Sequence, residues 1–292
     1  MSLYFVFTVD GDWDEYFSTE LTKAKRKPHR KGLAWLIKHE IKIARSIGGK
    51  LLHFVHTSPV AREYFFQPIF IALWKEIEKK GGSIGVHCHE EGLFSRGELK
   101  DPIMLEKSIR SLTEPLRKEG LTLISYRSGY LSFCKSVIPI LEKNGILLDF
   151  SCFSGRYLHY EGRLIANWRG APKNYYYMCY LDHCREGESN VVEIPIGKIK
   201  KRALYIDVTS LLDIWMIARH LAKKEKTIKG NIIVSLLTHT YEFSYLWKRL
   251  RIRAALFICS RYGSFINDKE VPDVIKEEKG MKNYENRNCS RK

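Results

Sequence analysis

Short apolar runs alternate along the chain with segments in which apolar residues recur at helical spacing. In the segment 32–49, for example, Leu33, Ile37 and Ile41 fall on one face before a Gly-Gly stop, which predicts a helix. Seven other runs have the length and the β-branched or aromatic content of strands. They are YFVFTV, KLLHFVHT, GSIGVHCH, LTLISYRS, ILLDFSC, VVEIPIG and NIIVSLLTHT.

Strands that alternate with helices indicate parallel strands joined by crossover helices. Seven such strands favour a β/α barrel, and we predict an α/β fold with a single domain over residues 1–266. Residues 152–190 break the alternation and are rich in Tyr, Trp and Gly, so we predict a long insertion over one rim of the barrel. Residues 267–292 are rich in Lys, Glu and Asn, and we predict a polar, disordered tail.

Ionisable residues stand at the ends of five of the predicted strands. Functional residues of β/α barrels come from the carboxyl ends of the strands and from the loops that follow them. Solvated charges placed at random would not fall so regularly at these positions, so we expect a functional site at this mouth. The residues are Asp10, Asp12, His87, His89, Arg127, Asp149 and His239.

The pair His87 and His89 is the clearest candidate for metal binding. The two residues are separated by one position, so on a strand both rings face the same side. With a carboxylate from a neighbouring strand they form a set that holds zinc or another divalent ion and leaves one position open for water. Glu91 is a rival third ligand if the chain turns into a loop there, and two ordinary histidines are the alternative. We expect His53 and His56 to be structural.

Six segments resemble, in chain order, the successive motifs of the polysaccharide deacetylases, a group of carbohydrate esterases. They are FTVDGDWD, SIGVHCHEE, YRSGY, LLDFSC, VVEIPIG and SLLTHT, and the resemblance covers about residues 3–243. It implies a distorted β/α barrel that removes an N-acyl group, with N-acetyl the expected case, from an amino sugar with the help of a divalent metal. Two glycines depart from the usual motifs: Gly11 separates two acids that are usually adjacent, and Gly129 stands where a proline usually precedes Tyr130.

The resemblance also implies roles for single residues. Asp10 matches the general base, and Arg127 matches the arginine that pairs with it. Asp12 and His87 match metal ligands, and His89 or Glu91 replaces the second histidine of the family. The implied metal is zinc, with cobalt, nickel or iron as alternatives.

The remaining matches concern proton delivery and the acyl group. His239 matches the catalytic histidine and Asp149 the acid that orients it. Tyr130 matches the residue whose backbone N–H stabilises the oxyanion, and Leu237 would line the pocket for the acyl methyl.

The chain carries a formal charge of +16 and has a pI of about 9.4, which favours an anionic partner. We expect an amino-sugar substrate linked to a nucleotide or a lipid during glycan biosynthesis, and peripheral contact with an anionic membrane surface is a further possibility. The basic stretch WKRLRIR is otherwise a solvated helix face. No stripe of basic and aromatic residues predicts specific binding of nucleic acid.

The seven cysteines are odd in number and scattered, and no signal-like segment opens the sequence, so we predict a cytoplasmic protein. Two alternative functions stay open. One is a deformylase, or another hydrolase of non-peptide amide bonds, that uses the same site. The other is a catalytically inactive barrel that binds glycans, which the altered histidine motif and the basic surface would suit.

Overall fold

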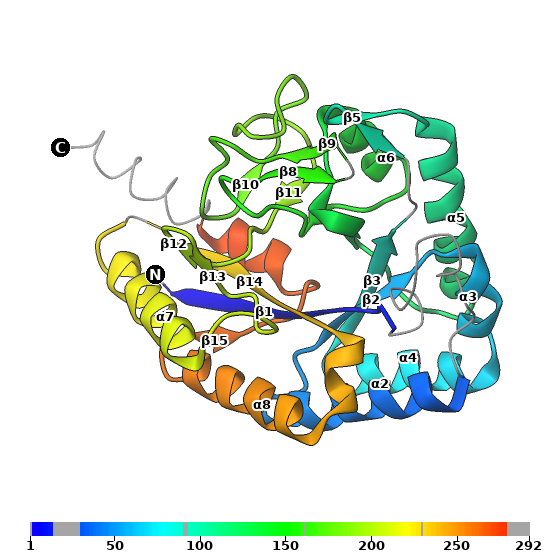
Figure 1. Cartoon of the computed structure of the whole chain (residues 1–292), viewed down its shortest axis with the longest axis horizontal. Coiled ribbons are helices and arrows are strands. Elements are labelled where there is room, and N and C mark those ends of the chain that lie inside the picture. The colour runs from blue at the N-terminus through cyan, green and yellow to red at the C-terminus, as the bar shows by residue number, and fades with distance from the viewer. Residues whose placement is uncertain (1, 14–29, 90–92, 161, 229, 279–292) are drawn as a thin grey trace.

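A computed structural model describes residues 2–13, 30–89, 93–160, 162–228 and 230–278 (Figure 1). All seven predicted strands form, and they pair in parallel in one sheet. They are β1 (Leu3–Asp10), β2 (Leu52–His56), β3 (Ser83–Cys88), β6 (Ser125–Ser128), β7 (Leu148–Asp149), β11 (Val192–Glu193) and β14 (Ile232–His239). The strand order is β10-β11-β7-β6-β3-β2-β1-β14, in which β10 (Tyr176–Tyr177) is antiparallel to β11, and β15 (Ser264–Phe265) pairs with β1.

The sheet curls until its two ends meet over a few residues. The chain after β11 reaches β14, where the Gly197 N–H donates to the Ser235 carbonyl (3.0 Å) and the Ser235 N–H donates to the Pro195 carbonyl (2.9 Å). A second bridge joins Tyr205 to Leu237. The predicted distorted α/β barrel, with about seven parallel strands in a single domain, is confirmed.

Helices surround the sheet (Figure 1). Two of them begin at side chains that cap them: Asp101 accepts from the Met104 N–H (2.8 Å), and Ser210 accepts from the Asp213 N–H (3.1 Å). The helices are α2 (Arg30–Ala44), α3 (Pro59–Phe65), α4 (Pro68–Lys79), α5 (Pro102–Lys118), α6 (Ile138–Lys143), α7 (Leu211–Glu225) and α8 (Leu246–Ser260). None of the helices in the described part of the chain combines the length and the apolar character that a membrane span requires.

The alternation of side chains along β1 divides the core. Phe5 and Phe7 belong to the large apolar layer that includes the helices, whereas Val6 packs with Phe54 and Phe150 in a second cluster. Thr8 and Asp10 continue the face of Val6 and are also buried. The interior therefore changes from apolar to polar toward the carboxyl ends of the strands, where the chemistry collects.

The predicted rim insertion, residues 152–190, contains a hairpin of β8 (Tyr157–Tyr160) and β9 (Arg163–Asn167). Trp168 anchors this segment, since its indole is buried and its Nε1–H donates to the Leu131 carbonyl (2.8 Å). Short elements complete the fold. They are β4 (Phe94–Ser95), β5 (Glu98–Leu99), β12 (Lys198–Ile199), β13 (Arg202–Ala203), η1 (Arg45–Ile47), η2 (Gly129–Leu131), η3 (Lys135–Val137) and η4 (Thr240–Ser244).

The prediction of a disordered tail from residue 267 is wrong for residues 267–278. Residues 271–278 are helical, and Val271 and Ile275 are buried in the second apolar cluster, with Val6 and Phe54. Asp268 is buried as well and accepts a hydrogen bond from Ser125 Oγ (2.5 Å). Val274 packs on the same cluster, and Glu278 accepts hydrogen bonds from Tyr175 Oη (2.8 Å) and the Asn231 N–H (2.7 Å). Few apolar side chains attach this helix, which is why its polar composition concealed it. Residues 279–292 lie outside the described residues.

Candidate active site

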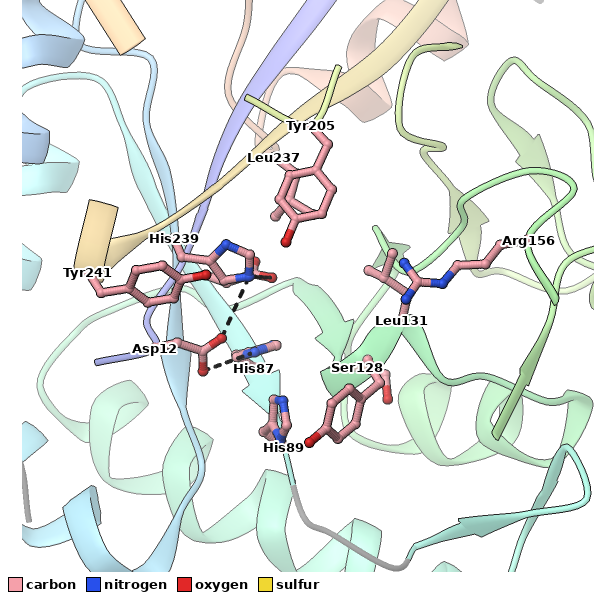
Figure 2. A pocket seen from close by; sticks show the side chains of 12 residues that line it. Asp12, His87, His89, Ser128, Leu131, Arg156, Tyr205, Leu237, His239 and Tyr241 are labelled. Atoms are coloured by element: carbon pink, nitrogen blue, oxygen red, sulfur yellow. Dashed lines mark ion pairs between the residues drawn. The ribbon is translucent and has the colours of Figure 1, made fainter. Parts of the chain in front are cut away.

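The register of the sheet brings the polar strand ends together. Asp10 pairs with His239 across β1 and β14, and His87 pairs with His56 on one side and with Arg127 on the other. These strands are parallel and end at the same mouth, where a cavity of about 210 Å³ opens (Figure 2). Six of the eight predicted site residues line it: Asp10, Asp12, His87, His89, Tyr130 and His239.

Asp12, His87 and His89 are all buried, and each offers a ligand atom within 4.8 Å of those of the other two. The Nδ1 atom of His87 lies 3.0 Å from the Arg127 carbonyl, so Nδ1 carries the proton and Nε2 presents its lone pair. This Nε2 atom lies 3.5 Å from Asp12 Oδ1. Neither atom has a hydrogen-bond partner among the residues that the structure describes.

Two buried acceptors that face each other need a proton or a cation between them. Burial opposes a proton on His87, but Asp10 and Asp12 outweigh it and raise the pKa of His87. The donor set of two imidazoles and one carboxylate is one that zinc and iron(II) accept. The residues therefore fit a divalent metal. Glu91, the rival ligand, lies outside the described residues, so His89 is the third ligand that the described chain offers.

His56, which the sequence led us to treat as structural, also belongs to the site. Its ring is fully buried, and its Nε2 atom lies 3.4 Å from Asp12 Oδ1. The Nδ1 atom accepts a hydrogen bond from the Ser58 N–H (2.9 Å), so the proton of the neutral ring is on Nε2. His56 can therefore donate toward Asp12 and orient its carboxylate, but it has no lone pair there for a metal.

His53 agrees with the structural expectation. Its Nδ1 atom pairs with Glu40 Oε2 (2.7 Å) in the core, and its ring stacks on Trp74 with the centroids 5.0 Å apart.

Arg127 lies behind Asp10 rather than in the cavity. Its Nη1 donates to Asp10 Oδ1 (2.8 Å) and to Thr8 Oγ1 (2.7 Å), and its Nε donates to the Phe150 carbonyl (2.9 Å). The guanidinium is completely buried and lies over the Phe54 ring, 4.8 Å from the centroid. Arg127 thus fixes one oxygen of Asp10 and neutralises its charge, while Oδ2 lies 3.9 Å from His239 Nε2.

The expectation that Asp149 orients His239 is wrong. His239 Nδ1 makes a short contact with Asp207 Oδ2, and Asp207 is itself held by the hydroxyl of Thr238 (2.5 Å). The other ring nitrogen, Nε2, lies 3.8 Å from Asp12 Oδ2. Both nitrogens of His239 therefore face carboxylates other than Asp149.

Asp149 is occupied elsewhere in the sheet. It pairs in register with Glu193 on β11, and its carboxylate accepts a hydrogen bond from Ser151 Oγ (2.7 Å). Burial raises the pKa of Asp149, and burial together with the charge of Asp149 raises the pKa of Glu193 well above its usual range. The pair therefore retains a proton at neutral pH and forms part of the core beside the site.

Asp207 could have been found from the sequence. The run ALYID ends in an acid after apolar residues, as FTVD does at β1. It was missed because the run is short and joins β14 through an isolated bridge at Tyr205 rather than as a strand.

Charges within the site set the protonation of its histidines. Burial alone would raise the pKa of Asp12, but His87, His89 and His56 hold it well below its usual range, so the group is a carboxylate. Burial lowers the pKa of His89 to about 4, so its ring is neutral and able to bind a metal. Burial would also lower the pKa of His239, but Asp207, Asp10 and Asp12 outweigh it and raise that pKa to about 9.

The two glycines that depart from the family motifs are explained by close approaches. A Cβ on Gly129 would lie 2.6 Å from the His89 ring, and a Cβ on Gly11 would lie 2.5 Å from the Phe54 carbonyl. Gly11 donates its N–H to that carbonyl (2.9 Å), which lets the chain turn between Asp10 and Asp12. After Gly129 the backbone of Tyr130 has a left-handed φ of 54°.

Comparisons with known proteins bear on the fold. No family model matches the sequence, and no curated protein matches it. A protein from Mycobacterium smegmatis, classed by inference as a polysaccharide deacetylase, matches with a TM-score of 0.58 at 14% identity, over 95% of this chain and 91% of that one. A protein from Parabacteroides distasonis, classed by inference as a glycoside hydrolase or deacetylase, has a TM-score of 0.64 at 12% identity, over 94% and 71% of the two chains.

The structure of this chain is also similar to that of a glycoside hydrolase. A branching enzyme from Thermococcus kodakaraensis matches with a TM-score of 0.51 at 10% identity, over 93% of this chain and 70% of that one. At such identities the likeness concerns the fold. This chain has a divergent form of the polysaccharide-deacetylase barrel, as its motifs predict, and it shares this fold with proteins named as carbohydrate-active enzymes.

Proposed function

We propose that this protein is a metal-dependent hydrolase that removes an N-acyl group, with N-acetyl the expected case, from an amino sugar in glycan biosynthesis. The proposal rests on three features that meet at one cavity. They are the Asp12–His87–His89 set, Asp10, which Arg127 holds from behind, and His239, which Asp207 holds. We place the protein in the cytoplasm on its cysteine pattern.

Asp12, His87 and His89 would hold the cation, for which zinc is the first candidate and cobalt, nickel or iron are alternatives. A divalent cation in such a set supplies a water of lowered pKa and polarises the acyl oxygen. Oδ1 of Asp10 is held by Arg127. The adjacent Oδ2 faces the cavity side of His239, where it can accept a proton from the attacking water.

His239 is positioned to protonate the departing nitrogen. Asp207 holds Nδ1, so the proton that can be transferred is on Nε2, and the surrounding carboxylates keep the ring charged at neutral pH. Asp10, Asp12 and His239 thus enclose the position at which the amide must bind. The backbone N–H of Tyr130 is our candidate donor to the developing oxyanion.

The cavity suits one small acyl group on a sugar residue. Leu237 and Leu131 give it apolar lining for a methyl, and its volume of about 210 Å³ lies below the roughly 300–1,000 Å³ of typical ligand pockets. The larger part of the substrate must therefore project from the mouth. A formyl group would also fit, so a deformylase remains the second candidate, distinguished by release of formate rather than acetate.

An inactive glycan-binding barrel is the remaining alternative. Two features oppose it: Asp10 is paired with Arg127, as a proton acceptor would be, and His239 is paired with Asp207, as a proton donor would be. Glycan binding alone requires neither pair. Incubation of purified protein with N-acetylated amino sugars, after chelation and after return of zinc, cobalt, nickel or iron(II), tests the choice. We expect metal-dependent release of acetate that His87→Ala abolishes and the surface variant Glu119→Gln retains. No acyl release with any metal, together with unchanged glycan binding in His87→Ala, would favour the inactive barrel.

A further inference from the structure

Arg156 directs a positive charge into the catalytic cavity. Figure 2 shows its side chain extending toward Asp12 and His239 from the opposite wall, beside Leu131 and below Tyr205. Its backbone is held on both sides, because its N–H donates to the Phe153 carbonyl and its carbonyl accepts from the Trp168 N–H, both at 2.8 Å. The cation is therefore carried by an anchored segment of the rim.

The charge of Arg156 is not matched by the protein. Among the residues that the structure describes, no carboxylate lies within ion-pair distance of its guanidinium, whereas Asp10 in the same cavity is paired with Arg127. Burial lowers the pKa of Arg156, which shows that the group is partly withdrawn from water. The described residue that faces its charge is the Phe153 ring, 5.9 Å away at the centroid. A partly desolvated cation in a substrate cavity without a carboxylate partner indicates that the substrate supplies the anion.

We propose that Arg156 binds an anionic group of the substrate next to the N-acylated sugar. The inference rests on the proposed function and adds to it a substrate class. A guanidinium binds the paired oxygens of a phosphate or a carboxylate through two parallel N–H donors, and the Tyr205 hydroxyl lines the same wall as an additional donor. Because the cavity is small, the anion lies on the reacting sugar or on the linkage directly attached to it.

Steady-state kinetics with matched substrates test this assignment. The substrates are N-acetylglucosamine, its 1-phosphate, its uridine diphosphate derivative and the corresponding N-acetylated uronic acid. We expect the wild-type enzyme to prefer the anionic compounds, and Arg156→Gln to raise KM for them by about tenfold or more, a larger loss than on the neutral sugar. Arg156→Lys should recover part of the loss, and Arg169→Gln, which removes an exposed arginine outside the cavity, should resemble the wild type.

The substrates also identify the source of the anion. A preference confined to the uronic acid indicates a carboxylate, and one confined to the phosphates indicates a phosphate ester. Equal KM values for neutral and charged sugars in the wild type, or an equal loss on both in Arg156→Gln, overturn the role of Arg156 without affecting the proposed reaction. No acyl release from any of the four compounds would count against the proposed reaction itself.

A separate feature concerns the outer surface of α8. Three large apolar side chains, at positions four and seven residues apart and so on one side of the helix, are exposed: Leu246 (64%), Leu250 (55%) and Phe257 (67%). Trp247 is exposed beside them. A soluble surface rarely presents such a row of apolar residues without a partner.

The same helix carries only positive charges. Lys248, Arg249, Arg251 and Arg253 lie on α8, and the helix contains no acid. Lys248 lies 5.5 Å from the centroids of both the Tyr245 and the Trp247 rings. Basic side chains beside exposed Trp, Tyr and Leu are the composition of helices that lie in the interface of an anionic membrane.

Helix α8 contacts the segment that carries Asp207. Arg251 donates to the carbonyl of Asp207 (3.1 Å), and the neighbouring Val208 is highly exposed. On the other side Arg249 lies over the ring of Trp35 on α2, 5.0 Å from its centroid. Figure 1 shows α8 on the outside of the barrel, next to α2.

We infer that the surface formed by Tyr245, Leu246, Trp247, Leu250 and Phe257 docks on an anionic lipid surface. Lys248 pairs with Glu242 (2.5 Å), but Arg249, Arg251 and Arg253 leave α8 positively charged. Charge complementarity therefore favours an anionic lipid surface over a second copy of this chain. Docking there would place the catalytic mouth close to a lipid-linked substrate.

Sedimentation with vesicles tests the inference on the full chain. We expect binding to phosphatidylcholine vesicles that contain anionic phosphatidylglycerol, weaker binding at high salt, and little binding to neutral vesicles. The double variant Leu246→Asp, Leu250→Asp should abolish binding to the anionic vesicles. The control variant Ile103→Asp, which changes an exposed apolar residue of α5, should bind as the wild type does. No binding, or equal loss in the α5 control, overturns the inference. So does a dimer in solution that only the α8 variant disrupts, since the surface would then join two copies.

Discussion

Asp207, from the loop between the Tyr205 bridge and α7, holds the Nδ1 atom of His239 at the end of β14. This contact holds the ring in place and turns Nε2 toward Asp10 and Asp12. The side chain that orients the candidate acid therefore comes from a position that the family motifs did not indicate, and Asp149 belongs to a separate buried pair.

Replacing these two acids separates their roles. Asp207→Asn removes the charge that supports the imidazolium, so we expect kcat to fall by about 10²–10⁴-fold, the usual contribution of general acid–base catalysis. Asp149→Asn leaves His239 and its partner in place and should keep kcat near the wild-type value. Acetate release under saturating substrate measures both, and a larger loss in Asp149→Asn would restore the original assignment.

Glu193 should make the stability of the fold depend on pH. Its pKa in the folded protein is raised well above the usual value of about 4.5, so folding retains a proton that the unfolded chain releases. The stability present at low pH is then lost as the pH rises above about 4.5, by at most about 1.4 kcal/mol per pH unit for one proton.

Glu193→Gln keeps a neutral side chain at every pH and should flatten this dependence. Urea unfolding between pH 5 and 8 gives the free energy of unfolding of both proteins. The difference between the two slopes of this free energy against pH is the contribution of the proton on Glu193. Parallel slopes would show that Glu193 is ionised in the folded state.

His56 should tune metal binding without being a ligand. Its Nε2–H points at Asp12, so His56→Ala removes a donor that orients the carboxylate. We expect the affinity for zinc to fall by about 10–100-fold, as for other partners of metal ligands, with one ion per chain still bound at saturation. Competition with a chromophoric chelator measures the affinity. Complete loss of zinc binding in His56→Ala would instead show that His56 is a ligand. The control is His220→Ala, which removes an exposed histidine of α7.

Gly129 should be intolerant of any side chain. Alanine would place a Cβ 2.6 Å from the His89 ring, which must then move out of the metal set. We expect Gly129→Ala to weaken zinc binding at least as much as His56→Ala, with a folded circular dichroism spectrum. Unchanged zinc affinity would show that His89 does not hold the metal.

The barrel could be predicted because its strands are apolar, separated by helices of clear period, and parallel. Those same strand ends gave Asp10, Asp12, His87 and His239, since a parallel sheet brings its carboxyl ends to one mouth. Asp207 follows a short apolar run, ALYID, that joins the sheet through a single bridge, so its sequence signal is weak. Arg156 comes from an irregular segment held by Phe153 and Trp168, and no local pattern places it. His56 lies on a predicted strand, but a lone histidine there looks the same whether it packs in the core or contacts a metal ligand.

Anomalous diffraction from crystals of the protein grown with zinc locates the metal directly. We expect one strong peak at about 2.0–2.2 Å from a carboxylate oxygen of Asp12 and from ring nitrogens of His87 and His89. A fully soaked crystal with no peak in this cavity, or with zinc bound only by residues elsewhere, would contradict this expectation.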